Sequence, residues 1–242
     1  ILSSVDEAIA ATEQVIDQTR RVKEGLLQEL LTRGIGHTRF KQTPIGEIPE
    51  SWEVKNVDFI ATFQGGSQPP RATFQNTPSP GFVRLIQIRD YKSDKYITFV
   101  PRDHKLTRRF CETDDVMIGR YGPPVFQILR GIKGAYNVAL IKAMPRTGFS
   151  KDFVFNVLKQ HKLFRLIDGL SQRSSGQTGV DMEALRSFPV AVPSAAERDA
   201  ICERMSSLRL LEKQNISALQ QLQQTKAGLL QDLLTGKVRV SV

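Results

Sequence analysis

Residues 23–32 read KEGLLQELLT, and residues 226–235 read KAGLLQDLLT, so eight of the ten positions are identical. The same offset of 203 residues aligns Ser3-Ser4-Val5 with Ser206-Ser207-Leu208. Two matches at a single spacing, with no gap between them, indicate an internal duplication rather than a chance likeness between leucine-rich helices. The duplicated segments therefore organise the chain.

Both copies have the spacing of a long amphipathic helix, because apolar residues recur at steps of three and four and neither copy contains proline. A helix of this length with one apolar edge needs a partner, and the simplest partner is the other copy, in an antiparallel coiled coil. Asn215 on the stripe either fixes the register or is tolerated near a gap. The residues predicted to pair the helices are Val5, Ile9, Ile16, Val22, Leu26 and Leu30 in the first copy and Leu208, Leu219, Leu222, Leu229 and Leu233 in the second, with Leu211 on the same stripe.

The segment between the copies begins with a connector rich in Gly and Pro and continues with short apolar runs typical of strands. Residues 151–170 have helical spacing. We therefore expect an α+β fold, with a strand-rich domain flanked by two long helices. The strands are expected at residues 52–63, 82–88, 96–100, 116–118, 125–129, 137–142 and 188–192.

The chain begins at Ile1, and the residues that precede the second helix have no counterpart before the first. This pattern predicts a fragment of a longer duplicated protein, holding one full unit of domain plus helix and the helix of the preceding unit. The expected boundaries are 1–34 for the first helix, 35–195 for the central domain and 196–238 for the second helix.

The charge is concentrated in the centre of the chain. The whole sequence of 242 residues has 34 basic and 25 acidic residues, a net charge of +9. Residues 54–190 alone carry 21 basic and 11 acidic residues, a net charge of +10, whereas residues 1–53 carry −3 and residues 191–242 carry +2. A basic centre between nearly neutral ends points to a local surface for a polyanion, with nucleic acid as the first candidate.

Composition argues against several other classes of protein. No apolar run approaches the ~20 residues that cross a bilayer, and no secretory leader is present, so membrane insertion and secretion are disfavoured. The two cysteines, Cys111 and Cys202, suggest neither a disulfide framework nor a paired-cysteine zinc site. A reducing cytoplasm is the expected compartment.

Three breaker-rich loops, at residues 65–70, 121–124 and 174–179, carry or adjoin most of the candidate DNA-binding side chains. Arg and Gln read guanine and adenine edges, while Lys, Ser and Thr suit phosphates, although a single surface Arg is more often simply solvated. The candidates are Ser67, Gln68, Arg71, Arg108, Arg109, Arg120, Tyr121, Arg130, Lys133, Arg173, Ser174, Ser175, Gln177 and Thr178.

Catalytic signatures are weak. Residues 122–125 match the loop of adenine methyltransferases only in their prolines, and Asp103-His104-Lys105 with Glu112 or Asp90 is a nuclease-like set that often arises by accident. Gly236-Lys237 is followed by Val238, so no phosphate-binding loop is present there. The three histidines, His37, His104 and His161, lack the spacing of metal ligands. We expect no catalytic residue, metal or cofactor.

Several motifs, taken together and in this order, resemble the DNA-specificity (S) subunit of Type I restriction-modification systems. The resemblance covers nearly the whole chain, and its strength lies in the combination rather than in any one motif. The motifs are IGEIPESWEV at 45–54, DDVMIGRYG at 114–122, SSGQTGV at 174–180, LRSFPVAVP at 185–193, Glu197 with Ile201, and GLLQDLLTG at 228–236.

The resemblance implies that the chain contains the central conserved helix, the second target-recognition domain and the C-terminal conserved helix of such a subunit. It further implies a non-catalytic protein that reads one half of a bipartite site in double-stranded DNA and directs methyltransferase (modification) subunits and an ATP-dependent restriction and translocase subunit. The sequence leaves open whether the two helices pair within one chain or between two chains, which would make the protein self-associate. The alternatives are a DNA-acting nuclease or methyltransferase with a divergent active site, and a helical scaffold with an incidental basic domain.

Overall fold

The computed structural model describes residues 2–173 and 179–235, which form two compact units. The helical unit comprises residues 1–30 and 200–242, and the central unit comprises Leu31–Asp199. These divisions differ by only a few residues from the predicted boundaries. No helix in the described part of the chain is both long and apolar enough to cross a membrane.

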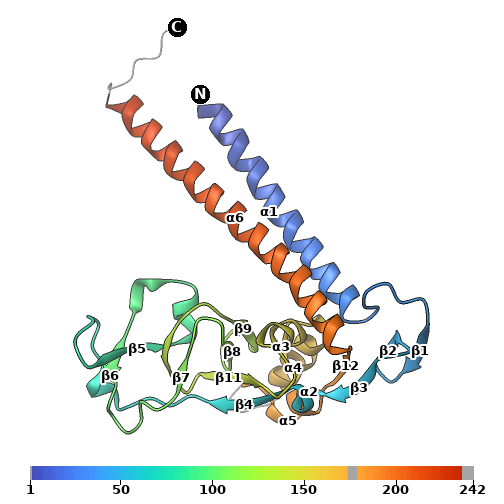
Figure 1. The fold of residues 1–242 in the computed structure, drawn as a ribbon. Coiled ribbons are helices and arrows are strands. Elements are labelled where there is room, and N and C mark those ends of the chain that lie inside the picture. Colours follow the sequence, from blue (N-terminus) through green and yellow to red (C-terminus); the bar gives the residue numbers. More distant parts are fainter. Residues whose placement is uncertain (1, 174–178, 236–242) are drawn as a thin grey trace. The chain divides into compact units, whose positions relative to one another are not determined.

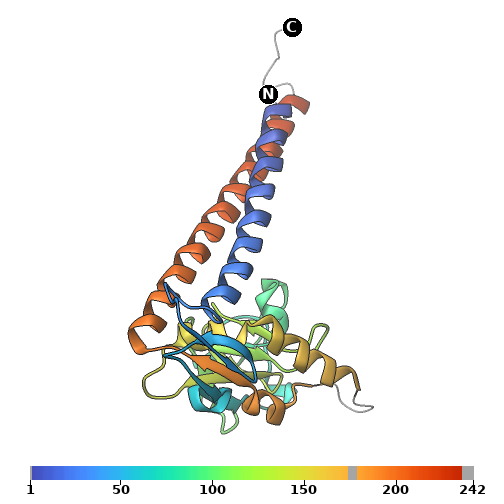
Figure 2. The same cartoon turned by 90° about the vertical axis from the view of Figure 1, so that its right-hand side faces the viewer.

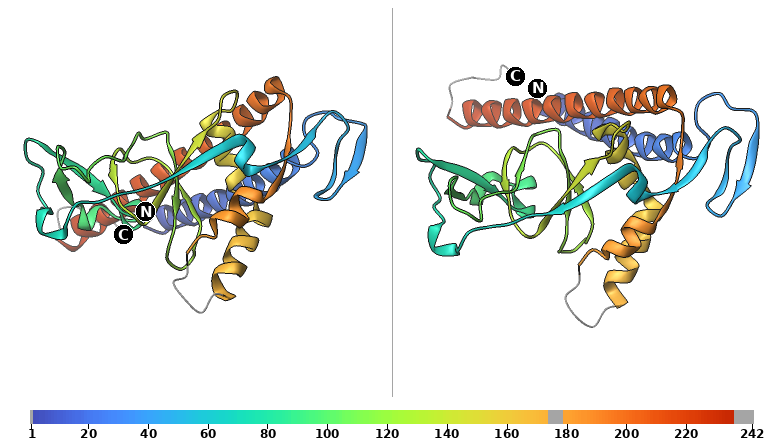
Figure 3. Two further views of the ribbon diagram at one scale, coloured as in Figure 1. Left: turned by 90° about the horizontal axis from the view of Figure 1, so that it is seen from below. Right: turned by 60° about the horizontal axis from the view of Figure 1, so that its bottom comes forward.

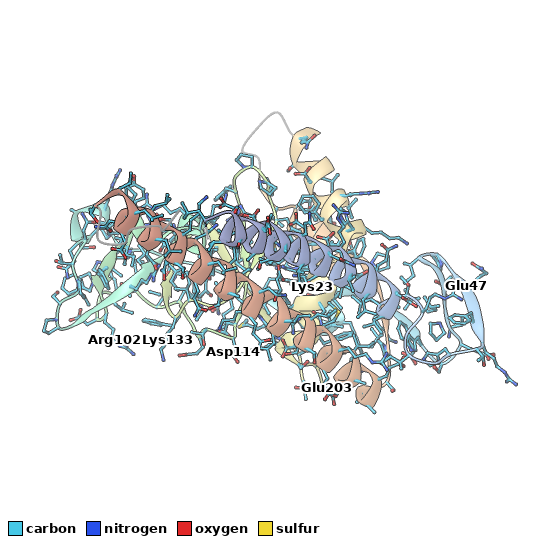
Figure 4. The ribbon with its side chains drawn as sticks, turned by 90° about the horizontal axis from the view of Figure 1, so that it is seen from above. Lys23, Glu47, Arg102, Asp114, Lys133 and Glu203 are labelled. Carbon is cyan, nitrogen blue, oxygen red and sulfur yellow. The ribbon has the colours of Figure 1, made fainter. Side chains whose placement is uncertain are left out.

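The helical unit contains α1 (Leu2–Leu30) and most of α6 (Ala195–Leu234), which run side by side in opposite directions (Figures 1 and 2). Ion pairs fix this antiparallel arrangement, because Lys226 binds Asp6 at 2.6 Å and Arg20 binds Glu212 at 3.0 Å. Lys23 pairs with the same Glu212 and lies on the side of α1 that faces α6 (Figure 4). The predicted antiparallel pairing of the two helices is confirmed.

The seam between the helices differs from the predicted stripe at Val22, which is 51% exposed, and at Leu211, which is 45% exposed. Lys23 and Glu212 take their places. Apolarity favoured the valine and the leucine, but a coiled coil prefers alternating steps of three and four. The charges of Lys23 and Glu212 neutralise each other on the seam. With this change the seam reads Val5, Ile9, Thr12, Ile16, Thr19, Lys23, Leu26 and Leu30 on α1, and Leu208, Glu212, Asn215, Leu219, Leu222, Lys226, Leu229 and Leu233 on α6.

The described residues of the central unit form two four-stranded sheets and two two-stranded ones. The β5 sheet has the order β6-β5-β10-β7, and the β11 sheet has the order β4-β11-β8-β9, while β1 pairs with β2 and β3 with β12. Three strand predictions were too long at their starts, because residues 137–139 form a turn before β11, residues 96–98 precede β6 and residues 125–126 precede β9. The strand predicted at 82–88 was too long at its end, because β5 ends at Ile86. The strands are β1 (Phe40–Thr43), β2 (Gly46–Pro49), β3 (Glu53–Asn56), β4 (Ala61–Gly65), β5 (Phe82–Ile86), β6 (Phe99–Pro101), β7 (Phe110–Cys111), β8 (Val116–Gly119), β9 (Gln127–Leu129), β10 (Gly134–Tyr136), β11 (Leu140–Pro145) and β12 (Pro189–Val192).

The predicted strand at residues 52–63 is interrupted by a helical turn, α2 (Val57–Ile60). A helical turn places Val57 and Ile60 on one face, whereas a continuous strand would send them to opposite faces. Both side chains are fully buried, and the N–H of Val57 donates to the carbonyl of Phe188 at 2.9 Å. Burial of both residues therefore favours the turn.

Residues 151–170, which have helical spacing in the sequence, form two helices, α3 (Lys151–Leu158) and α4 (His161–Arg173). The hydroxyl of Ser150 caps α3 by accepting from the N–H of Phe153 at 3.1 Å. A tightened last turn, in which Gln160 donates to the carbonyl of Val157 at 3.2 Å, ends it. The remaining short helices are α5 (Met182–Ser187), η1 (Arg71–Thr73), η2 (Ile88–Tyr91) and η3 (Asp94–Tyr96).

The core of the central unit joins its two large sheets. Ile86 and Tyr136 from the β5 sheet pack with Met117 and Leu140 from the β11 sheet, and all four are buried. The neighbouring Leu85 points to the opposite face, where it packs with Val100 and Ala135. The β5 sheet lies at one end of this unit and the β1–β2 hairpin at the other, as both views in Figure 3 show. The predicted α+β class is confirmed.

Candidate nucleic-acid interface

The residues Tyr136–Leu140, which we call the junction segment, pass from β10 to β11 and so connect the two large sheets. Three of the predicted recognition segments bond to this segment through their backbones. Ser67 donates its N–H to the carbonyl of Tyr136 at 3.1 Å, and Arg120 donates to the carbonyl of Ala139 at 2.8 Å. Arg109 accepts from the N–H of Tyr136 at 3.0 Å. The structure therefore brings together loops that are far apart in the sequence.

The first loop, which follows β4, approaches the junction segment very closely at Gly66. A Cβ atom on Gly66 would lie 1.9 Å from the carbonyl oxygen of Asn137, so only glycine fits here. The hydroxyl of Ser67 donates to the carbonyl of Leu106 at 2.8 Å, which ties this loop to the segment that carries Arg108 and Arg109. Ser67 and Gln68 therefore lie on the loop that is tied to this pair of arginines.

Tyr136 also holds this region in place through its side chain. Its side chain is fully buried, and its hydroxyl donates to Oε1 of Gln64 at 3.1 Å, at the end of β4. Burial raises the pKa of the Tyr136 phenol to about 12, although the nearby charge of Arg109 acts in the opposite direction. The phenol is therefore neutral and serves as a hydrogen-bond donor that holds the first loop in place.

The second loop begins at the end of β8 with Arg120 and Tyr121. The exposed Arg120 guanidinium lies 5.3 Å from the centre of the Tyr121 ring. The N–H of Val180 donates to the carbonyl of Arg120 at 3.1 Å, and Gly179 packs against Tyr121. Phe126, buried at a φ of +64°, holds the far end of this loop, because its N–H donates to the carbonyl of Gly119 at 3.0 Å.

The third predicted loop lies largely outside the described residues, although Gly179 and Val180 show that the chain returns beside the second loop. Arg173 is the last residue of α4. The candidates that fall outside the described residues are Ser174, Ser175, Gln177 and Thr178, and the side chain of Arg173 is outside them as well.

Arg130 and Lys133 do not join the other candidates. β9 runs antiparallel to β8, so Arg130 follows β9 at the opposite end of β8 from Arg120. Its guanidinium binds Asp152 at 2.7 Å and lies 4.5 Å from the centre of the Phe155 ring, while Lys133 binds Glu112 at 2.9 Å. These contacts indicate that Arg130 attaches β9 to α3, which a count of basic residues cannot reveal.

Arg71 lies between these two situations. It is exposed on η1, which leads from the first loop toward the bridge between Gln75 and Phe99 at the edge of the β5 sheet. The sequence analysis missed three neighbours of that sheet, Arg89, Lys95 and Tyr96. A tyrosine closely preceded by lysines is the signal that could have identified them.

Glu197 joins two of the quoted sequence motifs within the central unit. Its carboxylate accepts from Nε1 of Trp52 at 2.8 Å and from the N–H of Ile35 at 2.9 Å, and it lies 2.8 Å from Nε2 of His37. Gly34, at a φ of +68°, passes so closely that a Cβ atom there would lie 2.5 Å from the carboxylate. This Glu197 clamp fixes the connector to the first turn of α6.

Two members of the nuclease-like set make local hydrogen bonds to the backbone. Nδ1 of His104 accepts from the N–H of Leu106 at 3.1 Å, and Asp90 is buried and accepts from the N–H of Gln87 at 3.1 Å. Within residues 2–173 and 179–235, no group of three or more His, Cys, Asp or Glu side chains could hold a metal ion.

Comparison with known proteins identifies relatives along almost the whole chain. The Type I restriction enzyme MjaVIII specificity subunit of Methanocaldococcus jannaschii is 24% identical over 266 aligned residues, which cover 99% of this chain and 59% of the relative. The chain is a homologue of Type I restriction-enzyme specificity subunits. No protein-family model matches it.

Solved structures of specificity subunits share the fold of this chain. The S subunit from M. genitalium superposes with a TM-score of 0.64 at 14% identity, over 96% of this chain and 58% of the other. The HsdS subunit from Thermoanaerobacter tengcongensis gives a TM-score of 0.60 at 14% identity, over 98% and 56%. This chain therefore spans a little over half the length of these relatives.

Proposed function

We propose that the chain is a sequence-specific DNA-recognition module that reads one half of a bipartite target for a Type I restriction-modification complex. The observation that carries this proposal is the convergence of Ser67, Arg109 and Arg120 on the junction segment. Their loops carry arginines, an amide and hydroxyls in one region of a scaffold whose two large sheets share a core. These are the groups that bind phosphates and base edges in double-stranded DNA.

In this function the basic side chains displace counterions and set the position of the domain on the duplex. A few loop residues then form bidentate bonds to base edges, each contributing about 1–3 kcal/mol of discrimination between bases. The module itself carries no catalytic role. Partner methyltransferase subunits and a restriction and translocase subunit perform the chemistry, and the paired helices act as a spacer that also holds partners.

Binding to a random-sequence DNA duplex over a series of salt concentrations tests the electrostatic part. Replacing Arg108 or Arg120 with Ala should weaken binding and reduce the slope of log K against log salt by about one for each phosphate that is no longer bound. Arg165→Ala is the matched control, because Arg165 is exposed on α4. Binding by the unaltered chain that does not depend on salt would contradict the proposal.

A domain exchange tests the specificity part. The chain would replace the second half of a characterised Type I specificity subunit, and the methylated sites in the host genome would be sequenced. We expect one half of the methylated site to change while the other half is retained. A methylome with both halves of the original site unchanged, from a complex that still methylates DNA, would refute recognition by this module.

A further inference from the structure

A hollow of about 510 Å³ lies beside the outer strand of the β5 sheet, and none of the residues predicted to bind DNA lines it. Its lining combines cations, two aromatic rings, amide and hydroxyl groups, and the carboxylate of Asp94. The residues that line it include Asn76, Arg89, Lys95, Tyr96, Thr98 and Phe99.

Tyr96 is the central feature of this hollow, because its side chain is 56% exposed although tyrosine can bury a large apolar ring. The guanidinium of Arg89 lies 5.5 Å from the ring centre, and the ammonium of Lys95 lies 5.3 Å from it. Both cations are close enough to the ring for a cation–π interaction. An exposed ring beside two cations is suited to a nucleic acid, whose base edges and sugars offer contact area next to phosphates.

The acidic residues near Tyr96 cancel only part of this charge. Asp94 accepts from Nη2 of Arg84 at 2.9 Å, and the buried Asp90 is shared between Arg84 at 3.8 Å and Arg89 at 3.9 Å. Lys95 forms no ion pair with any residue that the structure describes. Residues 82–110 have eight basic and three acidic residues, and their net charge of +5 is half of the +10 carried by residues 54–190.

Tyr96 lies near the end of β5 at which the junction segment also bonds to the sheet. β6 runs antiparallel to β5 with Arg84 opposite Phe99, so residues just before β6 lie level with the end of β5. At that end the carbonyl of Ile86 accepts from the N–H of Asn137, the second residue of the junction segment, at 3.1 Å. The hollow and the junction segment therefore flank the same end of β5.

We propose that Tyr96 contacts a base or deoxyribose in a groove of the DNA while Arg89 and Lys95 bind the phosphates on either side. This inference rests on the proposed function and adds a contact to it. The ring would supply contact area at low entropic cost, and the two cations would orient the backbone. In the competing arrangement the cations bind phosphate and the ring only supports them.

The two arrangements give different salt dependences, measured with a random-sequence DNA duplex and the full chain. Tyr96→Ala should weaken binding about tenfold or more without changing the slope against salt, because it removes contact area but no charge. Tyr96→Phe should retain most of the affinity. Arg89→Ala and Lys95→Ala should each lower the slope by about one.

Phe59→Ala is the matched control, because Phe59 is also half-exposed and has Lys55 at 5.3 Å from its ring, but lies on α2. Tyr96→Ala with the affinity of Phe59→Ala would overturn the inference, and if Arg108→Ala still weakened binding, the proposed function would stand. An unaltered chain without salt-dependent binding to DNA would remove both. A circular dichroism spectrum identical to that of the unaltered chain shows that Tyr96→Ala is folded.

Discussion

The helical unit and the recognition region use the same cationic side chains in opposite ways. On the helices, Arg20, Lys23 and Lys226 each bind a carboxylate of the facing helix. In the recognition region, Arg108 and Arg120 form no ion pair with any residue that the structure describes. A cation that already has a carboxylate partner sets the register of its own fold, whereas one without a partner attracts a polyanion.

The largest expected effect comes from disrupting the apolar part of the seam between α1 and α6. Leu222→Asp with Leu229→Asp places two carboxylates between the helices, which should cost about 4 kcal/mol or more and separate them. The central unit should keep its own structure. Limited proteolysis checks this, since α1 and α6 should be cut while residues 31–199 survive. Loss of the central unit as well would mean that the two units do not fold independently.

The central unit also contains a paired set, in which Asp115 binds Lys142 and Lys151. Asp115 is buried, so Asp115→Asn leaves Lys142 without its carboxylate, whereas Lys151 keeps Asp114, and the change should cost about 3 kcal/mol. Urea unfolding measures the loss. Lys133→Ala removes a cation whose ion pair with Glu112 is exposed, and it should change stability by less than about 1 kcal/mol.

The same network predicts a pH dependence. Desolvation opposes ionisation of Asp115, but hydrogen bonds from Lys142 and Lys151 outweigh it and hold the pKa below the ordinary value of 3.8. The stabilisation is therefore complete above the ordinary value and is lost as the pH falls through the lowered one. Asp115→Asn should flatten the acid side of the stability curve. An unchanged acid limb would show that the network contributes nothing.

The seam pair offers a smaller test of what ion pairs do on the helices. Glu212→Leu alone leaves the half-buried Lys23 without its carboxylate and should cost about 1–2 kcal/mol. Lys23→Leu with Glu212→Leu should restore or exceed the original stability, because two leucines pack on a coiled-coil seam. Thermal unfolding of both single variants and the double variant gives the coupling energy. A double variant less stable than either single one would contradict this account.

Arg130 gives the smallest expected effect on DNA binding. Arg130→Ala should lower the stability of the central unit by about 1 kcal/mol, because it loses Asp152 and the Phe155 ring. The slope of binding against salt should stay unchanged, in contrast to Arg120→Ala. A slope reduced by about one would return Arg130 to the recognition surface.

The long helices were predictable because their pattern repeats over eight turns and twice in the chain. The error at Val22 arose because a stripe is chosen by apolarity, whereas Lys23 becomes compatible with the seam only once Glu212 lies opposite it. A pairing partner almost two hundred residues away leaves no mark in the local pattern. The same reason explains α2, where burial of Val57 and Ile60 on one side decides the backbone.

The loops of the recognition region could be predicted from the sequence, but not which of the candidate residues lie in it. Gly66, Ser67 and Arg120 lie beside strand ends, and strand ends are where loops meet. Arg130 also follows a strand, yet the antiparallel direction of β9 carries it to the other end of β8. Loop chemistry can be identified in a single sequence, whereas strand direction and order appear only when the sheet is assembled.

The bond between Trp52 and Glu197 also makes the chain its own optical probe. Trp52 is the one tryptophan of the sequence and is fully buried, with its indole N–H on the carboxylate that begins α6. Its emission therefore reports whether the connector still holds the first turn of that helix. Separation of the helices farther along should leave the emission maximum in place, whereas release of the clamp should shift it to the red.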